Sequence, residues 1–247
     1  RGVIAISAGN HAQATSWTCS KFGIKSTIVM PYGASLSKIE ATKSYGGNVI
    51  LTKDNMMDVC NEIRERKGLS FVHPFDDFKI INGQGTLSLE IIDKVKDVDY
   101  VFISIGGGGL ISGMAEVLKL INPRIKVYGV EPLNSNVMTR SIESNRPELF
   151  DTKKNKTIAD TLSAPFAGKI TFEYVKKYVD GIINVSEEEM KGALKLMIER
   201  LKVVPEPAAA ACFVPIIYNK LNIRPKSKCL VVVCGGNIEL NKMKTLF

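Results

Sequence analysis

The sequence predicts an α/β protein with two open parallel sheets, one in each of two domains. Short apolar runs rich in Val and Ile alternate with segments of helical periodicity, which is typical of successive βα units. One buried run, residues 100–105, stops at four consecutive glycines, and a helical pattern restarts directly after them. Turn signals containing Gly or Pro separate most of the other runs.

The first domain is predicted to span residues 1–76 as a small parallel layer of three or four strands. Its strands are expected at residues 2–7, 25–30, 48–52 and 71–73, and its helices at residues 11–22, 35–45 and 56–67. The segment HPFDD ends this domain, since a new helical pattern follows it.

The second, larger domain is predicted to span residues 77–247. Its strands are expected at residues 100–105, 126–131, 181–186 and 228–234, and its helices at residues 81–95, 110–121, 171–178, 187–201 and just after 207. Ser186 and Glu189 have the spacing of a capping box. Residues 132–170 lack periodicity and are expected to form loops, short helices or a lid, which often carry function.

Composition excludes several classes of protein. The 247 residues are 45% hydrophobic and 23% charged, as expected for a globular protein rather than a disordered one. No apolar run reaches membrane-spanning length and no signal-peptide pattern opens the chain, so a cytoplasmic location is expected. Five cysteines without a CxxC pair argue against a disulfide framework and a zinc site.

The net charge of +8 raises the question of nucleic-acid binding. The basic residues are interleaved with acidic ones, and the only compact cluster is the KKNK run at residues 153–156. No aromatic residues accompany that cluster as a stacking platform. We therefore expect neither a nucleic-acid nor a membrane partner, and an anionic small molecule suits the charge better.

The glycine run consists of Gly106, Gly107, Gly108 and Gly109. Without side chains, successive amides can converge on one phosphate, and the following helix adds the positive end of its dipole. A tight turn alone would be the simpler interpretation. A Walker loop is excluded because no GK[ST] follows.

A dinucleotide-binding site is the main rival for the glycine run, because Glu131 ends the next strand, where an acid could bind a ribose hydroxyl. However, the third glycine of the GxGxxG pattern is missing, since Ile111 or Ser112 stands at its position.

Two further loops follow predicted strands: SAGNH at residues 7–11 and CGGN at residues 234–237. The carboxyl edge of an open parallel sheet is where ligands bind, so we expect these loops and the glycine run to converge. SAGNH gathers hydroxyl, amide and imidazole groups at a helix N-terminus, which suits a carboxylate. A simple N-cap is the structural alternative.

The motifs SAGNHAQA, HPFDD, INGQGTLSLE, GGGGLISG, GVEP, TIAD, PEPA and CGGNIEL resemble, in this order, those of the threonine and serine dehydratases and serine racemase. These are pyridoxal-phosphate enzymes of fold type II, the tryptophan-synthase β fold. The likeness covers nearly the whole chain. It implies pyridoxal 5'-phosphate as cofactor and a homodimer or tetramer.

The resemblance also implies roles for single residues. The four glycines would hold the cofactor phosphate, Asn10 would bond the ring hydroxyl, and Cys234 would face the pyridine nitrogen. The substrate carboxylate would be bound by Ser7, Gly9 and His11.

The resemblance further implies a cation site near Glu131, with the Ser135 carbonyl as a second ligand and Mg, Ca or K as the ion. Val137 stands where the racemase carries an aspartate. This departure removes one carboxylate from the ligand set.

Relatives carry the Schiff-base lysine in an SFK-like motif ahead of the SAGNH strand. No lysine of this sequence lies in such a motif, and the sequence opens directly into a strand at Gly2 without an initial methionine. We therefore expect a preceding segment to hold this lysine. Residues 1–247 alone are then expected to be inactive, and no catalytic nucleophile is assigned among them.

The function that the resemblance implies is that of an L-threonine/L-serine ammonia-lyase, which yields a 2-oxo acid and ammonia. Serine racemase is an alternative, but a racemase needs a second acid or base, and Ala8 stands where serine racemase has a serine. A non-catalytic homologue that binds pyridoxal phosphate or an amino acid is a further alternative, and a nicotinamide dehydrogenase is the third.

Overall fold

The computed structural model describes residues 2–247, so Arg1, the first residue of the predicted first domain, lies outside the described residues. The chain divides into two compact units, of which the first ends at Pro74 and the second is Phe75–Phe247. The domain boundary predicted from the sequence, after residue 76, lies two residues beyond the observed end of the first unit at Pro74. Asp76 belongs with the second unit because its carboxylate bonds to backbone amides there.

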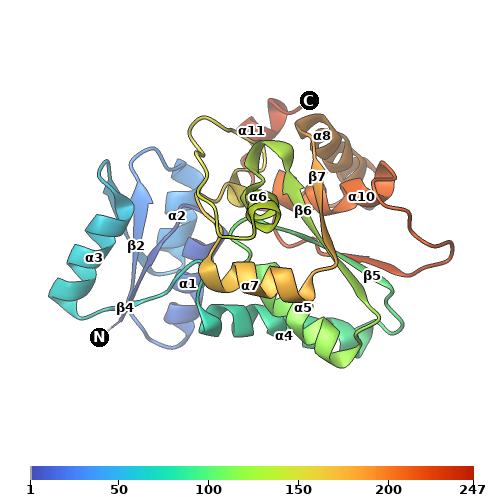
Figure 1. Ribbon diagram of the computed structural model, residues 1–247. Coiled ribbons are helices and arrows are strands. Elements are labelled where there is room, and N and C mark those ends of the chain that lie inside the picture. Colours follow the sequence, from blue (N-terminus) through green and yellow to red (C-terminus); the bar gives the residue numbers. More distant parts are fainter. Residues whose placement is uncertain (1) are drawn as a thin grey trace. The chain divides into compact units, whose positions relative to one another are not determined.

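The first unit holds one sheet with strand order β3-β2-β1-β4, in which every pairing is parallel. Its elements are β1 Val3–Ile6, α1 Asn10–Lys21, β2 Ser26–Pro31, α2 Leu36–Ser44, β3 Gly47–Thr52, α3 Met56–Lys67 and β4 Ser70–Phe71. Figure 1 shows α1 and α2 on one side of this sheet and α3 on the other. Separate apolar clusters fill the two faces, and β2 is almost entirely buried between them.

The second unit holds a second parallel sheet, with strand order β7-β6-β5-β8. Its strands are β5 Tyr100–Ser104, β6 Lys126–Pro132, β7 Gly181–Val185 and β8 Cys229–Val231. Its α-helices are α4 Phe78–Lys94, α5 Gly109–Ile121, α6 Val137–Ser144, α7 Lys169–Tyr178, α8 Glu187–Leu196, α9 Pro207–Ala210, α10 Val214–Ile217 and α11 Leu240–Lys244.

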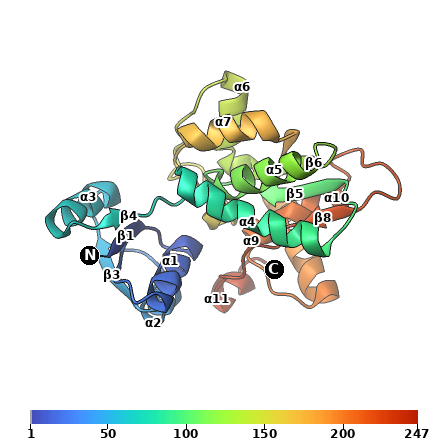
Figure 2. The same ribbon diagram turned by 90° about the horizontal axis from the view of Figure 1, so that it is seen from below.

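Helices cover both faces of the second sheet, which explains why β5 is buried at every position and apolar up to its last residue, Ser104. Helices α4, α5 and α7 group together on one side of β5 (Figure 2), where an apolar cluster includes Ile111 and Phe172. Helices α8 and α10 lie on the other side with a second cluster that includes Phe102 and Met190. This arrangement is the predicted α/β architecture with two parallel sheets.

Capping residues near the helix termini account for where several helices begin and end. Asn55 caps α3 by accepting from the amides of Met57 and Asp58, and Gly68 ends it in the left-handed conformation. The predicted capping box at Ser186 and Glu189 is confirmed, because both of its hydrogen bonds are present. The single helix expected at residues 187–201 is wrong in one respect, since its last turn, Met197–Leu201, widens into a π-helix.

Candidate functional site

The glycine loop joins the buried strand β5 to helix α5. Gly108 has φ of 91°, a conformation that a side chain would strain, and it forms the N-cap of α5 without a side-chain bond. Within residues 2–247, the backbone amides of Gly106, Gly107 and Gly108 donate to no recorded acceptor. The loop therefore presents adjacent amide donors at the positive end of a helix.

The surroundings of the loop leave no room for side chains. A Cβ at Gly107 would overlap the ring of Phe75, and one at Gly109 would lie 3.0 Å from the Phe75 Cα. A Cβ at Gly106 would lie 3.2 Å from the Leu162 Cα. The backbone is thus free to approach a ligand closely on the side that Phe75 and Leu162 do not occupy. Free amides in a cradle without side chains fit the dianionic phosphate of pyridoxal phosphate.

The CGGN loop follows β8, which pairs directly with β5. Its first residue, Cys234, is exposed overall. The Cys234 sulfur lies 3.7 Å from the hydroxyl oxygen of Ser104, which is the last residue of β5 before the glycine loop. The structure therefore brings these two predicted loops together. Desolvation of the sulfur raises the pKa of Cys234, and the nearby Glu206 carboxylate adds to the rise. The thiol stays protonated at neutral pH and is a weak partner for a ring nitrogen.

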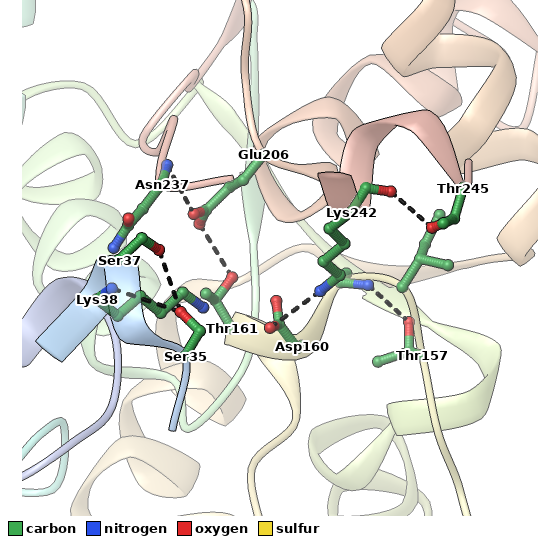
Figure 3. Close-up of polar contacts among 12 residues, drawn as sticks. Ser35, Ser37, Lys38, Thr157, Asp160, Thr161, Glu206, Asn237, Lys242 and Thr245 are labelled. Atoms are coloured by element: carbon green, nitrogen blue, oxygen red, sulfur yellow. Dashed lines mark hydrogen bonds and ion pairs between the residues drawn. The ribbon is translucent and has the colours of Figure 1, made fainter. Parts of the chain in front are cut away.

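Glu206 holds the CGGN loop in place. Its carboxylate is almost fully buried and accepts from the Thr161 hydroxyl at 3.0 Å and from the Asn237 amide at 3.3 Å (Figure 3). Its own amide donates to the Gly235 carbonyl at 2.9 Å. The PEPA motif contained this residue, but nothing local in the sequence indicated that its carboxylate would accept hydrogen bonds from two separate loops.

The SAGNH loop lies in the first unit, between β1 and α1. The Ser7 hydroxyl accepts from the Gly9 amide at 3.1 Å, so Ser7 shapes the turn before the helix. Asn10 and His11 are the first residues of α1, whose N-cap, Gly9, has no side-chain bond. The loop thus follows the carboxyl end of a parallel strand, as predicted, and the simple side-chain N-cap is absent among the described residues.

The His11 ring has a structural partner. Its Nε2 lies 3.1 Å from the Val72 carbonyl, which can only accept, so Nε2 carries the hydrogen. Burial lowers the pKa of His11, and the charge on His73 lowers it further, although the bond to Val72 opposes them. A neutral ring with Nε2 protonated offers only an acceptor at Nδ1. A carboxylate could therefore be bound by the His11 backbone amide but not by its ring.

Burial of the His11 ring predicts acid sensitivity in the first unit. Because the folded pKa of His11 lies below its ordinary value of 6.5, the unfolded state binds a proton first as the pH falls. The contribution of His11 to the free energy of unfolding should therefore be complete above about pH 6.5. It should decrease as the pH falls from there toward the pKa of His11 in the folded state. Fluorescence of Trp17, the only tryptophan, can follow denaturant unfolding from pH 7.5 to 5.5.

Two variants check the origin of this decrease. His11→Gln should remove most of it, because an amide can donate to the same carbonyl without titrating. His73→Gln, which removes the only other histidine, should keep most of it. Equal pH profiles for the wild type and His11→Gln would contradict the assignment.

Glu131 lies at the carboxyl end of β6 and is completely buried. Its carboxylate accepts from the Met138 and Thr139 amides at 2.9 and 2.8 Å and from the Thr139 hydroxyl at 2.6 Å. It therefore caps the N-terminus of α6 from outside that helix. Burial raises the pKa of Glu131 to about 7 against these three bonds. Because the carboxylate is completely buried, a group as large as a ribose would have no access to it, which weakens the dinucleotide interpretation.

Of the two predicted cation ligands, the Glu131 carboxylate is bonded to α6. Ser135 is fully buried and its hydroxyl donates to the Leu162 carbonyl at 3.3 Å, a bond that does not involve the Ser135 carbonyl, the predicted ligand. Across residues 2–247, no group of three or more His, Cys, Asp and Glu side chains could hold a metal ion. The same residues contain no helix with the length and hydropathy needed to cross a membrane.

Three residues that the sequence analysis did not assign to the site support the glycine loop. Phe75 covers Gly107 and Gly109, Thr171 bonds to the Gly107 carbonyl, and Asp76 bonds to the first turn of α7. Phe75 and Asp76 belong to the HPFDD motif, which was the only signal that could have singled them out.

Comparison with known proteins identifies the family of the chain. The sequence profile of a family described as "Pyridoxal-phosphate dependent enzyme" matches residues 1–235. The L-threonine ammonia-lyase of Thermotoga maritima is 45% identical over 245 residues, which are 98% of this chain and 60% of that protein. The catabolic L-threonine dehydratase of Escherichia coli strain K12 is 41% identical over 250 residues, covering 100% of this chain and 75% of that protein.

Among solved structures, maize serine racemase has a TM-score of 0.92 at 34% identity, covering 99% of this chain and 75% of its own. The chain thus spans 60% to 75% of the length of these relatives. The predicted fold of type II is confirmed by these likenesses and by the two parallel sheets. The chain belongs to the family of pyridoxal-phosphate-dependent enzymes.

Proposed function

We propose that the whole protein is an L-threonine/L-serine ammonia-lyase. It converts L-threonine to 2-oxobutyrate and ammonia, and L-serine to pyruvate and ammonia. The observation that carries this proposal is the glycine loop, whose free amides and closed Cβ positions suit a phosphate. Identities of 45% and 41% to proteins named as a threonine ammonia-lyase and a threonine dehydratase support the reaction type.

The residues of the glycine loop and the CGGN loop would hold opposite ends of pyridoxal phosphate. The amides of Gly106 to Gly109 bind the phosphate, and the Cys234 thiol faces the ring nitrogen. When bound, this cofactor withdraws electrons from the substrate α-carbon and makes its proton acidic. A neutral thiol leaves the ring nitrogen largely unprotonated, which favours elimination.

The SAGNH loop would supply the substrate contacts. The Ser7 hydroxyl and the amides of Gly9 and His11 bind the α-carboxylate, and Asn10 bonds the ring hydroxyl. The His11 ring fixes the loop through Val72 rather than binding substrate, because its donor is already in use. Donors at the N-terminus of α1 suit a carboxylate through the helix dipole.

Serine racemase is the second candidate, since the maize enzyme shares this fold at a TM-score of 0.92. Racemisation requires a proton donor on the face of the substrate opposite the base that removes the α-proton. In serine racemase the loop that matches SAGNH carries a second serine, and Ala8 stands at that position here. The methyl group of Ala8 has no proton to donate. We therefore favour elimination over racemisation.

The whole protein incubated with L-serine is expected to form pyruvate much faster than D-serine, and with L-threonine to form 2-oxobutyrate. A coupled lactate dehydrogenase assay measures the oxo acids, and chiral chromatography measures D-serine. A visible absorption band that shifts on adding either amino acid would support a catalytic cofactor site. D-Serine forming faster than pyruvate would contradict the argument from Ala8, and NADH binding without such a band would favour a dehydrogenase.

We also propose a homodimer or tetramer in the cytoplasm, and a cation at Glu131 and the Ser135 carbonyl. All five cysteines are free, which suits a reducing compartment. The buried Glu131 carboxylate retains lone pairs beyond its three bonds to α6, so it could also bind Mg, Ca or K. Light scattering and thermal stabilisation by each ion would test these points.

A further inference from the structure

Thr171 connects helix α7 to the glycine loop. Its side chain is fully buried in the first turn of α7. Its hydroxyl donates to the Gly107 carbonyl at 2.7 Å and lies 3.3 Å from the Gly168 carbonyl. Because a hydroxyl has one hydrogen, the shorter contact is the principal bond. A side chain 64 residues away in sequence therefore holds one specific peptide group of the loop.

The direction of that peptide group matters for anion binding. Gly107 and Gly108 are joined by a trans peptide, in which the C=O and the following N–H point in opposite directions. A bond that fixes the Gly107 carbonyl toward Thr171 thus fixes the Gly108 amide away from it. The Gly108 amide donates to no acceptor within residues 2–247, so it remains available to a ligand.

The bond should also strengthen the donor. A hydrogen bond to the carbonyl polarises the peptide and leaves its N–H more positive, as in other chains of hydrogen bonds. The left-handed conformation of Gly108, with φ of 91°, leaves this peptide without the restraint that a regular helix would provide. The Thr171 bond supplies that restraint.

Asp76 holds Thr171 in position. Its carboxylate accepts from the amides of Lys169 at 3.0 Å, Ile170 at 2.8 Å and Thr171 at 3.1 Å, which begin α7. A negative charge at a helix N-terminus is favourable. A Cβ at Gly168 would overlap the Asp76 carboxylate, so the close approach needs glycine there. Asp76 and Thr171 together attach the glycine loop to α7.

We propose that Thr171 is a positioning residue that orients the Gly108 amide toward the phosphate of the cofactor. Asp76 keeps Thr171 in place through its bonds to the first turn of α7. This inference rests on the proposed function, because it assumes that the loop binds a phosphate. Its chemistry is specific: the Thr171 hydroxyl should affect recognition of the phosphate and leave recognition of the pyridine ring unchanged.

The test compares pyridoxine 5'-phosphate with pyridoxine in the whole protein by equilibrium dialysis. Neither compound has an aldehyde, so binding requires no bond to a lysine. Thr171→Val keeps the shape of the side chain and removes the hydroxyl. We expect it to weaken pyridoxine 5'-phosphate binding about tenfold, the scale of one lost hydrogen bond, with unchanged pyridoxine binding. Thr171→Ser, which keeps the hydroxyl, should bind close to wild type.

Thr42→Val is the matched control. Thr42 is also fully buried, and its hydroxyl donates to the Lys38 carbonyl at 2.8 Å within helix α2 of the first unit. It should leave both affinities unchanged. Asp76→Asn, a second variant, should reduce phosphate binding in the same selective way, because it removes the charge that holds the first turn of α7.

The outcomes separate the two proposals. Wild type that binds both compounds equally would refute the phosphate site and with it the role of Thr171. If the wild type prefers pyridoxine 5'-phosphate and the Thr171→Val variant shows the same preference, the role of Thr171 is refuted while the phosphate site stands. Equal weakening of both compounds by Thr171→Val would also refute it, because a general loss of structure would then explain the result.

Discussion

Gly107→Asp is expected to lower the affinity for pyridoxal phosphate at least about a hundredfold, since it places a carboxylate against a dianionic phosphate. Steric conflict adds to the repulsion, because a Cβ at this position would overlap the Phe75 ring. Absorbance and fluorescence titration of the cofactor into the whole protein measures the loss. Circular dichroism should show that the variant remains folded.

Three further variants separate charge from shape. Gly107→Ala introduces the clash without the charge, and adding Phe75→Ala should recover part of its affinity by making room. Gly33→Asp is the matched control, because Gly33 is exposed in the first unit and a Cβ there meets nothing within 4 Å. Unchanged affinity in Gly107→Asp would exclude this loop as the phosphate site.

Gly113→Ala is expected to destabilise the second unit by about 3 kcal/mol, the upper range for overpacked interiors. Gly113 lies in α5 where that helix meets α4, and a Cβ would overlap the Ile81 carbonyl and lie 2.6 Å from the Gly85 amide. The Ser88 hydroxyl donates to the Met114 carbonyl at 3.1 Å across the same contact. The two helix backbones therefore lie too close for any side chain, and α4 would have to move.

Gly83→Ala, in the neighbouring helix α4, is expected to have the opposite effect on stability. A Cβ at Gly83 meets nothing within 4 Å, so the substitution should increase stability by about 0.5 to 1 kcal/mol through backbone entropy. Urea unfolding followed by far-ultraviolet circular dichroism compares both variants. If Gly113→Ala were as stable as the wild type, α4 and α5 could not be as close as described.

The glycine loop shows how the fold prepares a binding site. Its ends are fixed by regular structure, β5 and α5, while Phe75, Thr171 and Leu162 fix its sides. Most amides in a protein interior must find partners in the chain, so free ones held on several sides are poised for a ligand. Pre-organisation of this kind reduces the ordering cost of binding.

The sequence by itself determined the features that depend on near neighbours. Apolar runs of four to six residues mark the strands, as in β5, because a strand buried on both faces is predominantly apolar. The Ser186 and Glu189 capping box followed from residues three positions apart. The glycine run indicated its own turn and its exposed amides, and with the other motifs it indicated the family.

Only the tertiary structure decided which side chains serve that loop and which serve the fold. His11 meets the Val72 carbonyl because β4 lies beside β1 in the sheet, 61 residues away in sequence. Asp76 caps α7 through contacts that no local pattern encodes, because that helix begins 93 residues later in the sequence. Glu131 caps the next helix, α6, across seven residues, a spacing outside the usual capping patterns. Thr171 is one buried threonine among several in the sequence, and its role follows from its bond to the Gly107 carbonyl across 64 residues. Local propensity fixes elements within a few residues, whereas partners of buried polar groups are fixed only when strand order brings the elements together.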